Sequence, residues 1–213
     1  MPTEPRPGGV FAPLLDVLLP AVVDQVALDV LCLSDDEQRD RTELTGWALA
    51  ALGSVGGARL LQERREPRGL EMLLELLSRG LGLEGRPVAS RPAGTPRLAP
   101  GVGAGWELPI GITALLLEAA RGLPPGRALA WCWSAEARAW RLAWTASGRV
   151  PAVGEDPLGE RLAELLPEAR LERRAGEEIV EHALEVPRPW LRAPGSAVRV
   201  GGGPPDRGGR RWA

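Results

Sequence analysis

Few residues of this chain have side chains that could do chemistry, because several of the usual types are missing. The 213 residues include no lysine and no asparagine, one histidine (His182) and two cysteines far apart in the sequence (Cys32 and Cys132). A phosphate-binding P-loop and a Schiff base both need lysine, and one histidine with two distant cysteines cannot form a zinc site within one chain. We therefore predict no catalytic residue, no metal site and no bound cofactor. We expect the two cysteines to be free thiols that are buried like small hydrophobic residues, as in proteins of a reducing compartment.

The remaining polar candidates lie on one apolar segment near the N-terminus, and they are Asp16, Asp24, Gln25 and Asp29. Residues 10–33 are apolar over well over half of a helical circumference, which predicts a helix buried in a bundle or between subunits. Pro20 should kink this helix or mark its start. The four polar side chains then form either the polar edge of a buried helix or a surface that binds a protein partner.

A second helix is expected over residues 44–65, after a charged connection at residues 34–43, and it would complete a helical hairpin. Glycine weakens a helix and is tolerated best where another helix passes close, as the spacing of Gly53 and Gly57 would allow. Two such hairpins would pair as a four-helix bundle, so we expect a homodimer. A third helix is predicted over residues 70–81.

The clearest pattern of the chain lies between residues 108 and 145. An apolar helix over residues 112–123 ends at a Pro-Pro-Gly sequence, and two alternating runs follow it. Their large residues share one face: Leu129, Trp131 and Trp133, then Trp140, Leu142 and Trp144. This alternation predicts a β-hairpin that turns at residues 134–138. With a short strand at 87–90, a last helix at 160–166 and strands at 169–173 and 179–186, the expected fold class is α+β.

This order of helix, Pro-Pro-Gly turn and hairpin resembles the ATP-binding (GHKL-type) domain of bacterial sensor histidine kinases. In that family the helix reads Asn-Leu-Leu-x-Asn-Ala, and the two asparagine positions fall here on Ala114 and Glu118. In that family an Asp-x-Gly-x-Gly turn that holds adenine follows the hairpin. Here Thr145 stands at the aspartate and Ser147 at the first glycine. The resemblance implies a degenerate α/β sandwich of GHKL type that lacks the nucleotide-binding residues.

The resemblance extends to the N-terminal helices, which are similar to the dimerisation and phosphotransfer hairpin of these kinases. The phosphoacceptor histidine of the family aligns with Asp24, and the acidic residue after it aligns with Gln25. Both the nucleophile and its assisting group would therefore be absent. In the family a receiver domain docks on this hairpin, so the resemblance implies a receiver-like protein partner near the four polar residues named above.

Two other features have alternative interpretations. We interpret His182 as a surface residue of a terminal strand. The tryptophans of the hairpin either fill the core or plug the cavity that a nucleotide would occupy in an active relative. A stacking surface for single-stranded nucleic acid would need exposed aromatic rings with interleaved basic charge, and only Arg138 and Arg141 are near.

The predicted domain organisation is a flexible N-terminus (1–9), a hairpin dimerisation domain (10–66), a degenerate histidine-kinase-like ATPase domain (67–187) and a disordered Arg-, Gly- and Pro-rich tail (188–213). The predicted function is that of a non-catalytic, cytoplasmic protein–protein interaction module in bacterial signalling. Because no stretch has the ~20 apolar residues of a transmembrane helix, we expect no membrane segment. One alternative is a histidine-phosphotransferase-like phosphorelay protein. The other is a nucleic-acid-associated protein that acts through the Arg-rich tail.

Overall fold

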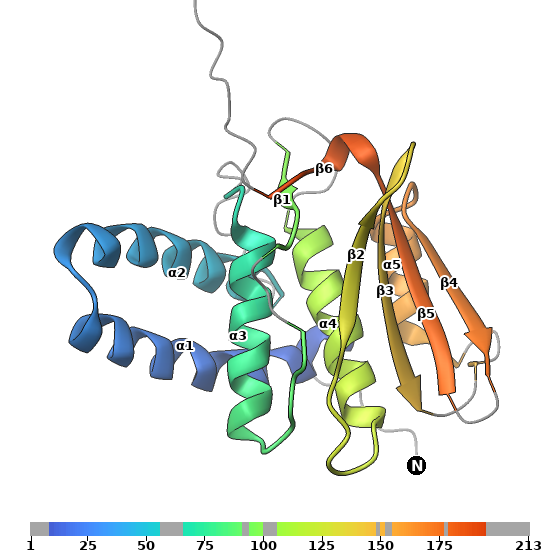
Figure 1. The fold of residues 1–213 in the computed structure, drawn as a ribbon, viewed down its shortest axis with the longest axis horizontal. Coiled ribbons are helices and arrows are strands. Elements are labelled where there is room, and N and C mark those ends of the chain that lie inside the picture. The colour runs from blue at the N-terminus through green and yellow to red at the C-terminus, as the bar shows by residue number, and fades with distance from the viewer. Residues whose placement is uncertain are drawn as a thin grey trace, which may run out of the picture.

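The computed structural model describes residues 9–55, 66–90, 94–99, 106–147, 150–151, 155–176 and 179–194. Over these residues the fold is α+β, with five α-helices, one four-stranded and one two-stranded antiparallel sheet (Figure 1). The helices are α1 (Ala12–Cys32), α2 (Asp35–Val55), α3 (Gly69–Leu83), α4 (Glu107–Gly122) and α5 (Pro157–Leu165). The strands are β1 (Arg97–Leu98), β2 (Trp131–Ala135), β3 (Ala139–Ser147), β4 (Arg170–Ala175), β5 (Ile179–Pro187) and β6 (Leu191–Arg192).

Helices α1 and α2 form a hairpin, but α2 begins nine residues before its predicted start at residue 44. The charged stretch that we expected to be a connection is helical, and its own side chains explain the difference. The Glu37 carboxylate accepts hydrogen bonds from the backbone N–H of Ser34 (3.1 Å) and from its hydroxyl (2.6 Å), as in a capping box. Three acidic residues in the first turn also complement the helix dipole. Helix α1 continues on both sides of Pro20, and the predicted end of α2 lies outside the described residues.

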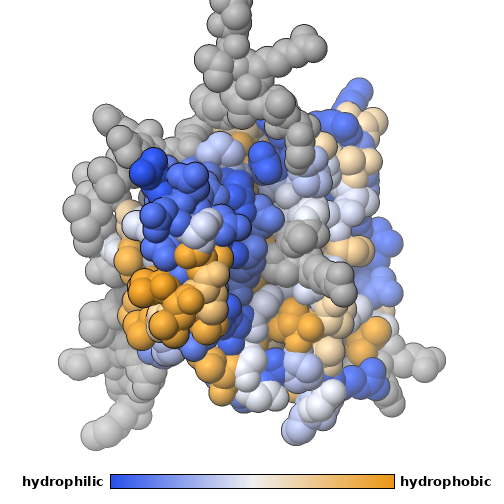
Figure 2. Space-filling view, turned by 60° about the vertical axis from the view of Figure 1, so that its left-hand side comes forward, coloured by the Kyte–Doolittle hydropathy of each residue, from blue (hydrophilic) through white to orange (hydrophobic). Residues whose placement is uncertain are grey.

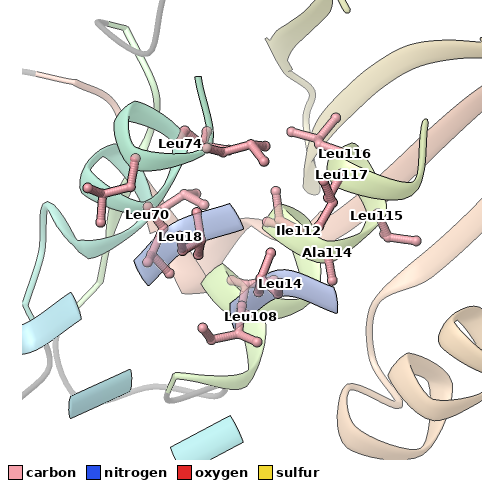
Figure 3. Close-up of a cluster of buried hydrophobic side chains, with 14 of the residues drawn as sticks. Leu14, Leu18, Leu70, Leu74, Leu108, Ile112, Ala114, Leu115, Leu116 and Leu117 are labelled. Carbon is pink, nitrogen blue, oxygen red and sulfur yellow. The ribbon is translucent and has the colours of Figure 1, made fainter. Parts of the chain in front are cut away.

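Helices α1, α3 and α4 build the main core (Figure 3). Leu14 and Leu18 of α1 face Leu70 and Leu74 of α3 and Ile112 of α4, and all five side chains are fully buried. The same cluster of buried residues continues to the strands of the large sheet, so the hairpin shares its core with the rest of the chain. The domain boundary between residues 66 and 67 stays a prediction.

Two glycines of α3 allow the hairpin helices to approach it closely. A Cβ at Gly80 would lie 2.6 Å from the backbone oxygen of Val17 in α1. A Cβ at Gly69 would lie 2.6 Å from the ring of Trp47 in α2. A larger residue at either position would push the hairpin away from α3.

The large sheet has the strand order β2-β3-β5-β4 and is antiparallel throughout. The predicted hairpin is confirmed as β2 and β3, with Trp131 opposite Trp144 and Ala135 opposite Trp140. Residues opposed in this way share a face, so the four tryptophans lie on one side of the sheet as the alternation predicts. Trp131, Trp140 and Trp144 are buried and Trp133 is half-buried. The strand predicted at residues 87–90 is a single parallel bridge between Val88 and Leu129.

The segment that we expected to begin a disordered tail is ordered from Arg188 to Pro194. After a 3-10 turn (Arg188–Trp190), strand β6 pairs with β1. Trp190 is buried, and the indole Nε1 of Trp140 donates a hydrogen bond to the carbonyl oxygen of Leu191 at 3.2 Å. The burial of Trp190 and this hydrogen bond explain why the segment is fixed to the domain. Residues 195–213 lie outside the described part of the chain.

Candidate functional site

Helix α1 has one buried face and one exposed apolar face. The buried face contacts α3 and α4 through Leu14, Val17, Leu18, Ala21 and Val22. On the other side Val23 is 70% exposed and Val30 is 67% exposed, and Leu19 and Val26 are 45% and 43% exposed. The predicted helix is therefore present, but within this chain only one of its faces is buried, and burial of the other face between subunits stays a prediction.

The exposed residues follow the spacing of a coiled-coil seam. Leu19, Val23, Val26 and Val30, which we call the α1 seam, are separated alternately by four and by three residues. This 4-3 repeat of apolar residues is the one with which a helix packs lengthwise against another helix. Figure 2, in which the hairpin side of the molecule comes forward, shows an apolar patch beside a strongly hydrophilic area. A patch of this kind on a surface usually marks an interaction site.

The four polar residues predicted as a partner-binding site all lie on α1, but they do not form one free acidic surface. Asp24 makes an ion pair with Arg79 of α3 at 2.5 Å. Gln25 is buried, and its side-chain amide donates a hydrogen bond to the carboxylate of Asp29 at 2.5 Å. Asp16 is exposed. The role of these residues in binding a partner stays a prediction.

Ion pairs fix α2 on α3 and leave one side of α2 accessible. Arg41 pairs with Glu75 at 2.6 Å, and Asp40 pairs with Arg68 at 2.9 Å. On the accessible side, Leu49 is 45% exposed. The hairpin therefore contacts α3 through these ion pairs while Leu49 of α2 points outward.

The two positions at which the histidine kinase family has asparagine both lie on helix α4. Ala114 is buried, whereas Glu118 is partly exposed. Glu118 lines two cavities, an apolar one of about 260 Å³ that Leu14 and Leu158 also line, and a more polar one of about 170 Å³ beside Trp144. Burial, followed by the negative charge of Asp156, raises the pKa of the Glu118 carboxyl above its ordinary value. The positive charge of Arg173 opposes this rise of the pKa.

The polar cavity brings His182 together with a buried ion pair. Asp156 caps α5 by accepting a hydrogen bond from the Gly159 N–H at 2.9 Å, and it also pairs with Arg173 of β4. The Asp156 and Arg173 side chains are only 11% and 17% exposed. Their sequence separation of 17 residues gave no sign of this contact, and the sequence-based reasoning missed both residues.

His182 is not the surface residue that we expected. Its ring stacks on Trp144, with 5.2 Å between the ring centroids and 18° between the ring planes. Burial, and then the positive charge of Arg173, lower the pKa of His182 from 6.5 to about 4, so the ring is neutral at pH 7. The alternation of β5 could have shown this, because His182 lies on the same face as the buried residues Val180 and Leu184.

The two cysteines also differ from their expected environment, since both are exposed. Cys32 is the last residue of α1, and Cys132 lies on the face of β2 opposite to the tryptophans. Thr145, at the family's aspartate position, is exposed on the same face of the sheet as Cys132. Within the described residues no group of three or more His, Cys, Asp or Glu side chains is arranged to hold a metal ion. No described helix has both the length and the apolarity that a membrane span requires.

Comparison with known proteins gives limited similarity. The sequence matches no protein-family model and no curated protein. A bacterial phosphotransferase structure is similar to this chain with 16% identity and a TM-score of 0.40, over 82% of this chain and 95% of its own. The histidine kinase AdeS of Acinetobacter baumannii is similar with 14% identity and a TM-score of 0.41, over 82% of this chain and 94% of its own. At TM-scores this low we transfer neither a fold name nor an activity.

Proposed function

We propose that this chain is a non-catalytic protein–protein interaction module, degenerate in the manner of a pseudo-histidine-kinase, that forms a homodimer through α1 and α2 and binds a partner in bacterial signalling. The observation that carries the proposal is the α1 seam. Exposure of an apolar helix face to water is unfavourable, and a face with heptad spacing is covered best by a second helix with the same spacing. A second copy of this chain supplies such a helix, and a hairpin from each copy gives a four-helix bundle.

The homodimer is tested by sedimentation velocity over a range of protein concentrations. Wild type should be dimeric, and Val23→Glu should be monomeric, because a carboxylate in the new core costs about 3 kcal/mol or a factor of about 100 in the dimer dissociation constant. The matched control is Leu83→Glu, since Leu83 is also an exposed apolar residue (59%) but lies at the end of α3. A wild type that stays monomeric at high concentration, or a Val23→Glu dimer of unchanged affinity, would refute the proposal.

The partner is proposed to bind the hairpin at Asp16, Asp24 and Asp29, while the buried Gln25 holds the Asp29 carboxylate by its hydrogen bond. Carboxylates next to apolar residues favour a partner with a basic rim around an apolar patch. Reversal of Asp24 is a poor test, because the new arginine would face Arg79. Asp16→Arg avoids this difficulty, since Asp16 is exposed and no described residue forms an ion pair with it.

Affinity capture from the native host provides the partner test. Wild type should capture a receiver-type protein, Asp16→Arg should lose it, and Glu164→Arg should retain it. Glu164 is a suitable control because it is an exposed carboxylate (66%) on α5, away from the hairpin. If Asp16→Arg captures the same protein with the same affinity, the partner does not bind at this surface.

The proposed lack of catalysis follows from the resemblance and agrees with the residues at the site. An alanine and a partly exposed glutamate stand where the family has metal-binding asparagines, and Trp144 and His182 stack in the cavity beside them. The phosphorelay alternative needs an accessible histidine on a bundle helix. The one histidine of the sequence lies in β5 against Trp144, which supports the non-catalytic proposal over that alternative.

A further inference from the structure

The face of the large sheet that turns away from the tryptophans carries a row of small side chains. Cys132 lies opposite Ala143, which lies opposite Ala183, and Glu172 of β4 completes the row. Opposed residues share a face, so this row crosses all four strands and ends at a carboxylate. An exposed sheet face usually carries large polar side chains, and this row is an exception in the middle of it.

Larger side chains stand on both sides of that row. The register places Arg141 and Glu185 on one side and Glu181 and Arg174 on the other. Arg141 on the first side and Glu181 and Arg174 on the second line a cavity of about 440 Å³ over Ala143 and Ala183, which we call the outer trough. This volume lies within the ~300–1,000 Å³ of small-molecule sites.

Three arginines meet around Glu172, at the β4 end of the outer trough. Arg141 and Arg174 approach the same oxygen, Oε2 of Glu172, from opposite walls, each at 3.6 Å, and Arg170 approaches the other oxygen at 3.4 Å. Charge-assisted hydrogen bonds are normally ~2.7–2.9 Å long, so none of the three guanidinium groups is closely bound to Glu172. Arg141 makes its short contact, 2.7 Å, with Glu185. The end of the trough therefore has donors to spare for another oxyanion.

We propose that the outer trough binds a small organic anion with a flat apolar body. The body lies over Ala143 and Ala183, where only small side chains keep the floor low. The anionic head binds at the Glu172 end, between Arg141 and Arg174. The negative charge of Glu181 on the wall repels the head and keeps it at that end. This site is separate from the α1 seam, so it does not depend on the proposed dimer.

The two exposed cysteines provide the test, because one lies in the outer trough and the other lies on α1. The probe is 8-anilinonaphthalene-1-sulfonate, an aromatic anion, and the measurement is the rate at which iodoacetamide alkylates each thiol, followed by peptide mass spectrometry. At a probe concentration tenfold above its dissociation constant, alkylation of Cys132 should slow about tenfold. Alkylation of Cys32 should stay within a factor of about two of its rate without probe.

Two variants locate the binding. Arg141→Gln should weaken the protection of Cys132 about tenfold, as expected for the loss of one charge-assisted hydrogen bond. Ala143→Leu should abolish protection by filling the floor, and Arg161→Gln on α5 is the matched loss of a paired surface arginine that should change nothing. The proposal is overturned if Cys132 reacts at the same rate with and without the probe, if only Cys32 is protected, or if Arg141→Gln, with an unchanged circular dichroism spectrum, is protected like wild type.

Discussion

Acidification should destabilise this protein through His182. The His182 ring stacks on Trp144, and burial, followed by the positive charge of Arg173, lowers its pKa from 6.5 to about 4. A histidine with a lower pKa in the folded chain binds a proton more readily when the chain is unfolded. Its contribution to the free energy of unfolding is therefore complete above pH 6.5 and is lost as the pH falls from 6.5 towards 4.

The size of this effect follows from the difference between the two pKa values. The gap between 6.5 and about 4 corresponds to about 3 kcal/mol, at ~1.4 kcal/mol per pKa unit. The ring is only half-buried, so water screens part of the interaction and we expect about 1–2 kcal/mol. This is a measurable part of the ~5–15 kcal/mol that stabilises a typical domain.

The assay is urea unfolding at a series of pH values with wild type and His182→Phe. Phenylalanine keeps an aromatic ring beside Trp144 but has no titrating group, and the titration of the other side chains cancels in the difference between the two proteins. The stability of wild type relative to the variant should fall by about 1–2 kcal/mol between pH 7 and pH 4.5. Because the sequence has one histidine, its ring proton NMR signal in an untagged protein also gives the pKa directly. A ring that titrates near 6.5, or parallel loss of stability in both proteins, would refute this reasoning.

Three further predictions concern stability and binding. Asp156→Ala should lower the free energy of unfolding by about 2–4 kcal/mol, because it removes a helix cap and leaves Arg173 buried without its partner. The control Glu164→Ala should change the free energy of unfolding by less than about 0.5 kcal/mol, and urea titrations measure both variants. In the monomer, Leu18→Ala should lower the free energy of unfolding by about 2–5 kcal/mol and Val23→Ala by less than about 0.5 kcal/mol. Thermal denaturation of dilute protein measures both differences. Calorimetry with Mg-ATP should give no heat of binding, and a micromolar dissociation constant would contradict the proposed degeneracy.

Local sequence patterns determine most of the secondary structure. The alternation of large residues predicts β2 and β3 and the shared face of their tryptophans, because side chains in a strand point alternately to its two faces. The early start of α2 was also readable, since Ser34 and Glu37 have the spacing of a capping box. It was missed because a highly charged stretch is easily interpreted as a connection.

The two faces of α1 could not be separated by sequence. Both faces are apolar, and the side that becomes buried is decided by where α3 and α4 contact the helix. Gly80 fixes this contact, since only glycine lets the backbone near Val17 come so close. Whether Leu18 or Val23 is covered is thus a property of the tertiary structure.

The ion pairs of the domain could likewise not be predicted from the sequence. Asp24 and Arg79 are 55 residues apart, and Arg141 and Glu185 are 44 residues apart. Charged residues as numerous as these have many possible partners, and only the folded chain selects one of them.

What the sequence determined by itself is the order of the helices and of the four strands of the large sheet, the α+β class and the absence of lysine and asparagine chemistry, because periodicity and composition are local properties. Only the tertiary structure decided which apolar face of α1 stays exposed, that His182 stacks on Trp144, and that a row of small residues opens the outer trough. The face of α1 depends on helix contacts between distant segments, and the other two features depend on strand register, since a shift of one residue would move the side chains of a strand to the other face of the sheet.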